Sequence, residues 1–399
     1  MRRCAGPDTD RFARERWGRD PLLTRSAERG GDFADLLSLA AVDELLSQRG
    51  LRTPFLRVVK DGSPVDPNRF TRAGGAGAEV GDQVADDLVL RLILDGATVV
   101  LQGLHRVWPP IVDFAGQLAA DLGHPVQVNA YVTPAASRGF SAHYDVHDVF
   151  VLQIAGRKRW LVHEPVLPLP LRSQPSGSRQ GEVDQAAADQ ALIDEVLHPG
   201  DALYLPRGYL HSARALGEVS AHLTVGVHPV TRHAIVEVLG ALAAEEPELR
   251  ESLRLGIDLA DPAELATELA QTVSSLVKYI ENVSVEDVAA RLRSDIWSAT
   301  RAAPIGPLSQ VAAIESLGPD SVVRLRPHLR HRVSDSAGRV VLELADRTIS
   351  LPARTRPALD VLLSGSPVMV ADLPALDAAD GQVLVRRLLR EAVLVPSTT

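Results

Sequence analysis

The sequence predicts an α+β protein with a β-rich part, then a helical part and a small mixed part. Three observations carry this prediction. Short runs with strand composition and turn signals recur up to about Pro229. From Thr231 to about Thr300, apolar residues recur at the three- and four-residue spacing that is typical of amphipathic helices. Residues 305–399 alternate strand and helix patterns again, in an order that suggests a small winged-helix-like module.

The bulk composition is that of a soluble globular protein. A chain of 399 residues is too long for one compact core, so two or three domains are expected. Hydrophobic residues make up 45% and charged residues 23% of the chain, and both values are ordinary. The net charge of −9 argues against a nucleic-acid or anionic-membrane surface over the whole molecule, so we expect neither kind of partner.

Cysteine usage and hydropathy indicate a cytoplasmic protein. The single cysteine, Cys4, excludes an internal disulfide framework and a cysteine-based zinc site. The N-terminal stretch MRRCAGPDTD has no apolar core of a signal peptide. No run approaches the roughly 20 apolar residues that a membrane span needs.

Local patterns predict several elements within the β-rich part. Residues 10–23 are expected to form a short amphipathic helix followed by an extended entry into a sheet, and residues 32–49 another helix. The stretch IVDFAGQLAADLG is predicted to be a helix that stops at its glycine. In PVQVNAYVTP apolar and polar residues alternate, so Asn129 and Tyr131 share a face that is directed to either a wet cavity or solvent.

Two further segments are predicted from composition and capping signals. Residues 172–191 are polar and poor in large apolar side chains, which favours a loop or lid. In the helical part, Asp261, Pro262 and Glu264 form the N-cap, first-turn proline and capping-box glutamate of one helix. Ser284 caps the next.

A candidate metal site begins with His143 and Asp145. Residues two apart on a strand point to the same face, so both side chains can reach one ion. His211 follows Gly208 and can come from a neighbouring antiparallel strand if the sheet closes into a barrel. Two imidazoles and one carboxylate that leave positions open on the metal form the ligand set of non-haem Fe(II) oxygenases. His147 shares the parity of His143 and Asp145 and is an alternative to His211.

Lys158 is a candidate partner for an anionic cosubstrate. A 2-oxoglutarate molecule that chelates iron through its keto-acid end leaves a distal carboxylate that needs a cation. Lys158 shares strand parity with Trp160 and Val162, which favours an inward direction. The alternative is an exposed basic hairpin tip at residues 157–159. Three polar residues, Ser220, His222 and Thr224, also share one face of a later strand.

With these residues in view, the chain resembles the JmjC/cupin-type ribosomal oxygenases, which are Fe(II)- and 2-oxoglutarate-dependent protein hydroxylases. The similar segments are FARERWGRDPLL, NAYVTP, HYDVHDVFVLQIAGRKRWLVHEP, PGDALYLPRGYLHSA and SAHLTV, which span much of residues 10–230. The resemblance implies a double-stranded β-helix catalytic domain over residues 1–230. It also implies a helical dimerisation domain over residues 231–304 and a winged-helix-like domain over residues 305–399.

The resemblance also implies roles for individual residues. It makes His143, Asp145 and His211 the iron ligands and Lys158 the partner of the distal 2-oxoglutarate carboxylate. The further pocket positions that it implies are Asn129, Tyr131 and Thr224. We therefore expect a homodimeric oxygenase that uses Fe(II), 2-oxoglutarate and dioxygen to hydroxylate a protein side chain, with a ribosomal protein as the leading substrate class. The alternatives are a hydroxylase that tailors a peptide natural product or its precursor, and a non-catalytic dimeric cupin scaffold or regulator.

Overall fold

The computed structural model describes residues 1–77, 79–135, 137 and 141–397. The chain forms two compact units, Met1–Pro229 and Val230–Thr399. The first predicted domain boundary, after residue 230, lies beside this division. The second predicted boundary, at residue 305, falls within the second unit and stays a prediction.

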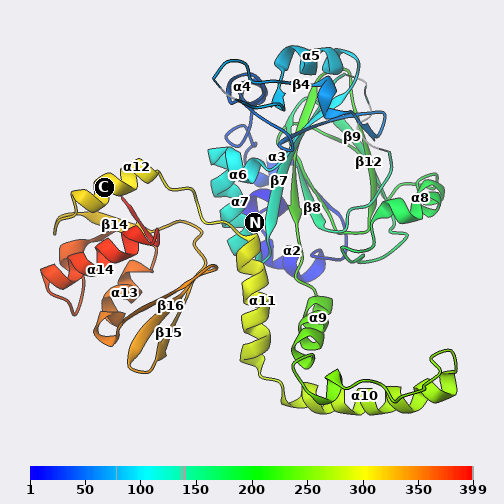
Figure 1. Cartoon of the computed structure of the whole chain (residues 1–399). Coiled ribbons are helices and arrows are strands. Elements are labelled where there is room, and N and C mark those ends of the chain that lie inside the picture. The colour runs from blue at the N-terminus through cyan, green and yellow to red at the C-terminus, as the bar shows by residue number, and fades with distance from the viewer. Residues whose placement is uncertain (78, 136, 138–140, 398–399) are drawn as a thin grey trace. The chain divides into compact units, whose positions relative to one another are not determined.

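The first unit, in which Figure 1 labels β7 and β8, is built on an eight-stranded sheet that is antiparallel throughout. The strand order is β1-β11-β8-β13-β7-β6-β2-β3. Its strands are β1 (Leu22–Thr24), β2 (Leu56–Lys60), β3 (Ser63–Pro64), β6 (Thr98–Leu101), β7 (Val126–Thr133), β8 (Asp148–Ala155), β11 (Ala202–Leu205) and β13 (Ser220–Val227). The central strands β7, β8 and β13 are the longest, with eight residues each, and they carry much of the candidate site. A two-stranded ribbon of β4 (Thr71–Arg72) and β5 (Gln83–Val84) stands apart from this sheet.

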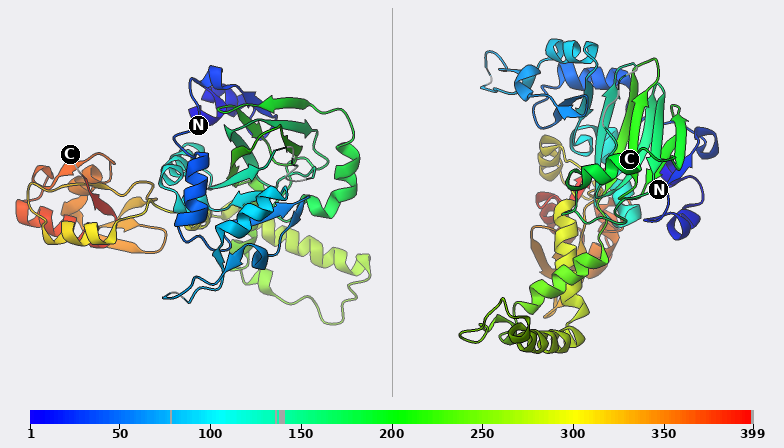
Figure 2. Two further views of the ribbon diagram at one scale, coloured as in Figure 1. Left: turned by 90° about the horizontal axis from the view of Figure 1, so that it is seen from above. Right: turned by 90° about the vertical axis from the view of Figure 1, so that its right-hand side faces the viewer.

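A three-stranded antiparallel sheet with the order β10-β9-β12 covers part of one face of the large sheet. Its strands are β9 (Lys158–His163), β10 (Ile193–Leu197) and β12 (Leu210–Ala215). Val149 and Val151 of β8 pack against Trp160 and Val162 of β9 in one buried cluster. The two sheets therefore form the predicted cupin-like pair (Figure 2). Side chains of both sheets are directed into the space between them.

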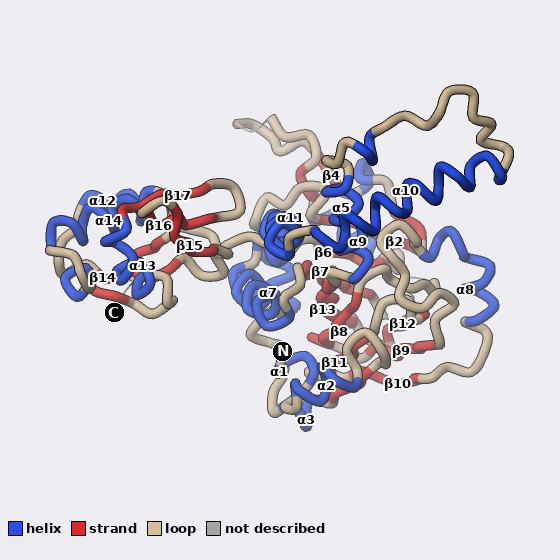
Figure 3. The backbone as a smooth tube through the Cα atoms, turned by 90° about the horizontal axis from the view of Figure 1, so that it is seen from below, coloured by secondary structure: helices blue, strands red, loops and turns tan. Residues whose placement is uncertain are grey.

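Helices cover the opposite face of the large sheet, where the main core of the unit lies (Figure 3). The helices that precede β7 in the chain are α1 (Arg2–Ala5), α2 (Thr9–Glu15), α3 (Ser26–Arg29), α4 (Leu39–Gln48), α5 (Asp86–Leu94), α6 (Leu104–Val107) and α7 (Pro109–Leu122). A short 3₁₀ turn, η1, spans Pro67–Arg69. Helix α7 ends at Gly123 in the left-handed conformation, which confirms the predicted glycine stop. Helix α4 begins later than predicted, because the Ser38 side chain accepts a hydrogen bond from Ala41 N and sets the start there.

The polar stretch 172–191 is more ordered than the predicted loop or lid. It contains a 3₁₀ turn, η2 (Ser176–Arg179), followed by helix α8 (Gln180–Ala186). Exposed pairs such as Gln180 with Asp184 support the helix, whereas Val183 is fully buried. One buried apolar side chain in a polar segment leaves little periodicity to detect, and for this reason the sequence pattern favoured a loop.

The second unit begins with three helices, α9 (Arg232–Ala243), α10 (Pro262–Asn282) and α11 (Val285–Ala299), and a 3₁₀ turn, η3 (Glu248–Arg250). Asp261 caps α10 through Ala263 N, Pro262 is its first residue, and Ser284 caps α11 through Glu286 N. The predicted N-caps and the first-turn proline are thus confirmed. The predicted capping box is wrong, because Glu264 accepts a hydrogen bond from Asp258 N and the N-cap amide of Asp261 donates to Asp258 O. None of the described residues of α10 or α11 is buried, although both helices carry an apolar side.

The rest of the second unit has its own hydrophobic core and two three-stranded antiparallel sheets, β18-β14-β19 and β15-β16-β17. Its strands are β14 (Val322–Leu325), β15 (Arg332–Ser336), β16 (Arg339–Glu343), β17 (Thr348–Pro352), β18 (Val368–Met369) and β19 (Leu394–Pro396). Its helices are α12 (Pro307–Glu315), α13 (Arg356–Leu362) and α14 (Ala378–Arg390), with 3₁₀ turns η4 (Ala353–Thr355) and η5 (Val370–Asp372). Over the part of the chain that the structure describes, no helix combines the length and apolar character of a membrane span.

Candidate metal centre

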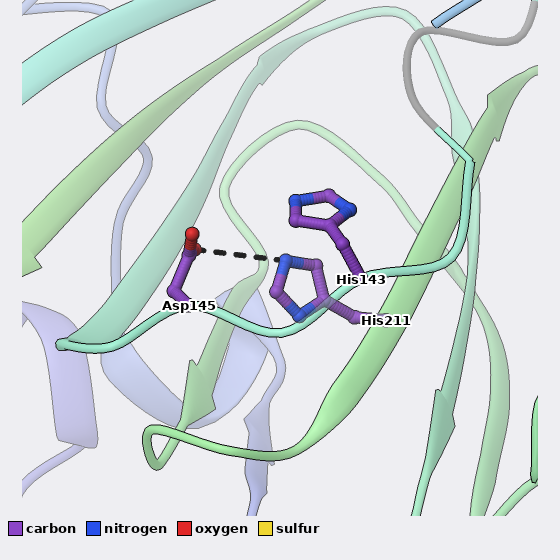
Figure 4. A group of neighbouring side chains, drawn as sticks. All are labelled: His143, Asp145 and His211. Carbon is purple, nitrogen blue, oxygen red and sulfur yellow. Dashed lines mark ion pairs between the residues drawn. The ribbon is translucent and has the colours of Figure 1, made fainter. Parts of the chain in front are cut away.

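The three predicted ligands meet where two extended segments of the first unit are bridged. His143 and Asp145 lie on the segment that leads into β8, and His211 is the second residue of β12. His211 N donates to His143 O at 2.8 Å, and His143 N donates to His211 O at 3.2 Å. This pair of backbone bonds places ligands from distant parts of the sequence beside one another (Figure 4).

The side chains converge closely enough to hold one ion. One ligand atom from each of His143, Asp145 and His211 lies within 4.8 Å of the others. Asp145 Oδ2 is 3.7 Å from His211 Nε2, and the two imidazole rings are tilted by 55° with centroids 4.4 Å apart (Figure 4). Among the residues that the structure describes, these three form the only group with this geometry.

Hydrogen bonds to backbone carbonyls set the tautomer of both histidines. His143 Nδ1 is 2.8 Å from Ser141 O, and His211 Nδ1 is 3.1 Å from Tyr209 O. A carbonyl oxygen only accepts hydrogen bonds, so each Nδ1 must carry the proton and donate it. The lone pair of each imidazole then lies on Nε2, as a metal ligand requires.

The charge states also suit a metal. Burial opposes ionisation of Asp145, but the surrounding imidazoles of His211, His147 and His143 outweigh it and lower the pKa of the carboxyl group. Burial, with a contribution from His143, lowers the pKa of His211 to about 4 against the opposing effect of Asp145. A carboxylate and a neutral His211 imidazole are therefore present at neutral pH.

The structure does not place His147, the alternative ligand, in this group. Its Nε2 atom lies 3.3 Å from Gln127 Nε2, and its ring packs edge-on against His228 with centroids 5.1 Å apart. Gly226 provides the space for this arrangement, since a Cβ atom there would lie 3.2 Å from the His147 ring. The side chain of His147 is thus packed beside Gln127 and Gly226.

A cavity of about 250 Å³ extends from the three converging side chains into the space between the two sheets. Its lining includes predicted site residues from β7, β9 and β13, namely Tyr131, Lys158 and Thr224. The inward face of β7 is thus a cavity wall at Tyr131, and the sequence had left open whether this face meets a cavity or solvent. Asn129 differs from Tyr131, because its side-chain oxygen accepts a hydrogen bond from Gly103 N at 3.0 Å and it is absent from the lining.

Lys158 points into the cavity, as its parity with Trp160 predicted, and only 3% of it is exposed. Its Nζ atom donates to Thr133 Oγ1 at 3.0 Å and lies 3.5 Å from His222 Nδ1. No carboxylate of the described residues forms an ion pair with it. Burial without such a counter-charge lowers the pKa of Lys158 to about 7, so this cation would gain stability from a bound anion.

His222 completes the wall around Lys158. Its ring stacks on Tyr131 with centroids 5.1 Å apart and meets Trp160 edge-on at 5.4 Å. Burial, together with the nearby Lys158 and His211, lowers its pKa well below the ordinary histidine value. His222 is therefore a neutral, tightly packed imidazole at physiological pH.

Four further lining residues with polar or aromatic side chains were not predicted as site residues from the sequence. They are Arg57, Thr98, Trp160 and Ser212. Arg57 alternates with the buried Leu56 and Val58 along β2, so its direction away from the main core was detectable. Its place in the cavity wall depends on the sheet order, in which only β6 separates β2 from β7.

Comparisons with known proteins agree with this geometry. A family model described as "JmjC domain" matches residues 113–235, which include all three converging side chains. Ribosomal oxygenase 1 of Homo sapiens is 30% identical over 223 residues, which are 55% of this chain and 32% of that protein. The bifunctional lysine-specific demethylase and histidyl-hydroxylase NO66 of Drosophila persimilis is 29% identical over 283 residues, 68% of this chain and 39% of that protein. The chain therefore carries a JmjC-domain match at the residues of the candidate site and is similar to ribosomal oxygenases.

The chain spans less than two fifths of the length of either curated relative. Its fold is also that of a smaller solved protein. The crystal structure of the Escherichia coli ribosomal oxygenase YcfD matches 97% of this chain and 98% of its own, with a TM-score of 0.56 and 17% identity. A structure of YcfD in complex with cobalt and 2-oxoglutarate matches 99% of both chains, with a TM-score of 0.54 and 17% identity. At these identities the likeness establishes a shared fold.

Proposed function

We propose that this JmjC protein is an Fe(II)- and 2-oxoglutarate-dependent oxygenase that hydroxylates a side chain of a ribosomal protein. One observation carries the proposal. A single cavity has two imidazoles and a carboxylate at one end, and at the other a buried lysine that no carboxylate of the described residues pairs with. This arrangement matches a metal-chelating cosubstrate with a distal negative charge.

The donor set fits iron. His143 and His211 would each offer Nε2, because their Nδ1 atoms are held by carbonyl oxygens, and Asp145 would offer one oxygen. Two imidazoles and one carboxylate leave further metal positions for cosubstrate and dioxygen. When bound, iron and 2-oxoglutarate supply the oxidising chemistry that activates dioxygen and yields succinate and carbon dioxide.

The chain's own residues would bind and orient the cosubstrate. Lys158 would hold the distal carboxylate, and Thr133 fixes the direction of its ammonium group. A charge-assisted hydrogen bond is strong in a buried site, because little water competes for either partner. Tyr131, His222 and Trp160 pack together around this end of the cavity and exclude water from it.

A ribosomal protein is the proposed acceptor class. Relatives of this chain are named ribosomal oxygenase 1 and bifunctional lysine-specific demethylase and histidyl-hydroxylase NO66. The net charge of −9 favours encounter with a basic partner, and ribosomal proteins that bind RNA are basic. The names of the relatives and the negative net charge of this chain therefore both favour a ribosomal protein as the acceptor.

The proposal is tested with purified protein, Fe(II), 2-oxoglutarate and the ribosomal proteins of the source cell. We expect slow 2-oxoglutarate decarboxylation by the protein alone, faster turnover with acceptor, and one ribosomal protein that gains the mass of one oxygen atom. Intact-mass spectrometry of ribosomal proteins from cells with and without the gene checks the same acceptor. Decarboxylation of 2-oxoglutarate without a mass change in any ribosomal protein would favour a peptide-tailoring hydroxylase. The absence of any decarboxylation would favour a non-catalytic scaffold.

We also propose that the protein is a homodimer formed through the helical part of its second unit. The apolar side of α10 is exposed, with Leu269, Val273 and Ile280 each 40–58% accessible. A helix with an apolar stripe is normally stabilised by burying it, and a second copy of the same helix would cover it symmetrically.

We expect the wild-type protein to have twice the mass of one chain in size-exclusion chromatography with light scattering. Leu269→Asp would place a charge on the apolar stripe and shift the protein to the monomer. The matched control is Gln271→Asp, which adds the same charge at an exposed position of the same helix. A monomeric wild type, or equal masses for the two variants, would contradict this interface.

The finer domain assignments belong to the same proposal. Residues 231–304 would be the dimerisation domain and residues 305–399 a winged-helix-like domain in a cytoplasmic protein. The support for the last domain is its separate hydrophobic core and its order of helices and strands. We propose no nucleic-acid partner for it.

A further inference from the structure

Residues 164–191, which include α8, pack against the ligand-bearing segments on the side that faces away from the cavity. We call them the covering segment. Tyr144 stands between His143 and Asp145, and Leu210 immediately precedes His211. Neighbouring side chains on extended backbone point to opposite sides. The ligands turn toward the cavity, so Tyr144 and Leu210 turn away from it and pack with Val183 of α8.

Tyr144, Leu210 and Val183 form a hydrophobic cluster that is separate from the main core. Each is exposed by 2% or less, and Val183 of α8 is the member that comes from the covering segment. Tyr144 Oη also donates a hydrogen bond to Gln174 O at 3.0 Å. Val183 therefore shares one buried cluster with the residue between two ligands and the residue before the third.

A second contact joins the same segment to the turn before His211. Gly208 has a φ of +94°, and a Cβ atom there would lie 2.6 Å from Leu167 O and 2.9 Å from Pro170 Cδ. The amide of Gly208 donates to Asp145 O at 3.1 Å. The covering segment thus lies directly against a turn that holds the backbone of a ligand.

We propose that residues 164–191 brace the metal centre, with Val183 as a positioning residue that acts through Tyr144 and Leu210. Backbone hydrogen bonds join the two ligand segments at the bridge from His143 to His211 and from Gly208 N to Asp145 O, and the Val183 cluster packs against both segments from outside. Metal affinity depends on the spacing of these segments, because ligands that are already in place lose little freedom on binding. The inference rests on the proposed metal site.

The test compares Val183→Ala with the wild type in a titration with Co(II), followed by the visible absorbance of the bound ion. Outer-shell changes typically weaken metal binding about 10- to 100-fold, so we expect Co(II) affinity to fall at least about tenfold. Excess metal should restore most turnover, because the ligands themselves remain. The matched control is Val89→Ala, which removes an equally buried valine from helix α5 in the main core.

Both variants should lose similar thermal stability, and only Val183→Ala should lose Co(II) affinity. Equal affinities for Val183→Ala and the wild type would overturn the brace while leaving the metal centre intact. A wild type that binds no Co(II) would overturn the metal centre itself. If Val183→Ala does not fold, Val183→Thr keeps the shape of the side chain, and the same comparison with Val89→Thr then decides.

Discussion

Replacing Asp145 with alanine is expected to reduce 2-oxoglutarate decarboxylation to the rate without enzyme. Asp145 is the only anionic member of the converging group, and His143 and His211 alone would hold a divalent ion weakly. Changes to outer-shell partners already cost about 10- to 100-fold in metal affinity, so loss of a direct ligand should cost more than about 100-fold. Metal titration and turnover at fixed Fe(II) both measure this loss.

The matched control is His147→Ala. His147 lies two residues further along the same segment and contributes to the low pKa of Asp145, but it is not in the converging group. We expect His147→Ala to retain most of the metal affinity and turnover. Activity that survives Asp145→Ala, or that is abolished by His147→Ala and not by His211→Ala, would show that the ligand assignment is wrong.

Replacing Lys158 with alanine is expected to raise the KM for 2-oxoglutarate steeply and leave metal affinity unchanged. Truncating one partner of a buried, hydrogen-bonded charge pair costs about 2–5 kcal/mol, which corresponds to roughly 30-fold to several thousand-fold. Arg159→Ala is the matched control, because Arg159 is the next residue on β9 but is exposed and paired with Asp194. Similar KM values for the wild type and Lys158→Ala would exclude Lys158 as the carboxylate partner.

The pH profile of the wild type provides a second readout of Lys158. Burial favours the neutral amine and lowers its pKa to about 7, whereas a carboxylate ligand requires the protonated form. The fraction of protein molecules with a protonated Lys158 therefore falls as pH rises, from about one half at pH 7 to about one tenth at pH 8. Because only these molecules bind the carboxylate, the apparent affinity for 2-oxoglutarate falls about fivefold over the same range. Lys158→Arg should remove this dependence, since arginine stays charged.

The alternation of side chains along extended backbone is enough to determine much of the site. His143 and Asp145 point the same way because strand side chains repeat every two residues, and Lys158 follows Trp160 inward for the same reason. The N-caps at Asp261 and Ser284 are equally local, because each cap bonds to an amide two residues away. Such features depend only on neighbours in the chain, so the sequence predicts them.

Contacts between distant segments were decided only by the tertiary structure. Asn129 and Tyr131 share a face of β7, yet the β6–α6 turn takes the Asn129 side chain through Gly103 while Tyr131 remains in the cavity. The sequence favoured His211 over His147 as the third ligand, and the structure brings His211 rather than His147 beside His143 and Asp145.

The covering segment, residues 164–191, also combines a local property that the sequence shows with a contact that only the tertiary structure shows. Sequence composition identified residues 172–191 as polar. It did not indicate that Val183 would share a buried cluster with Tyr144 and Leu210. The physical reason is that periodicity reports which side of an element is apolar, whereas the partner of that side depends on how the whole chain packs. The sequence thus determined the ligand types and their local directions, and the packing of the two sheets and α8 determined which of them meet.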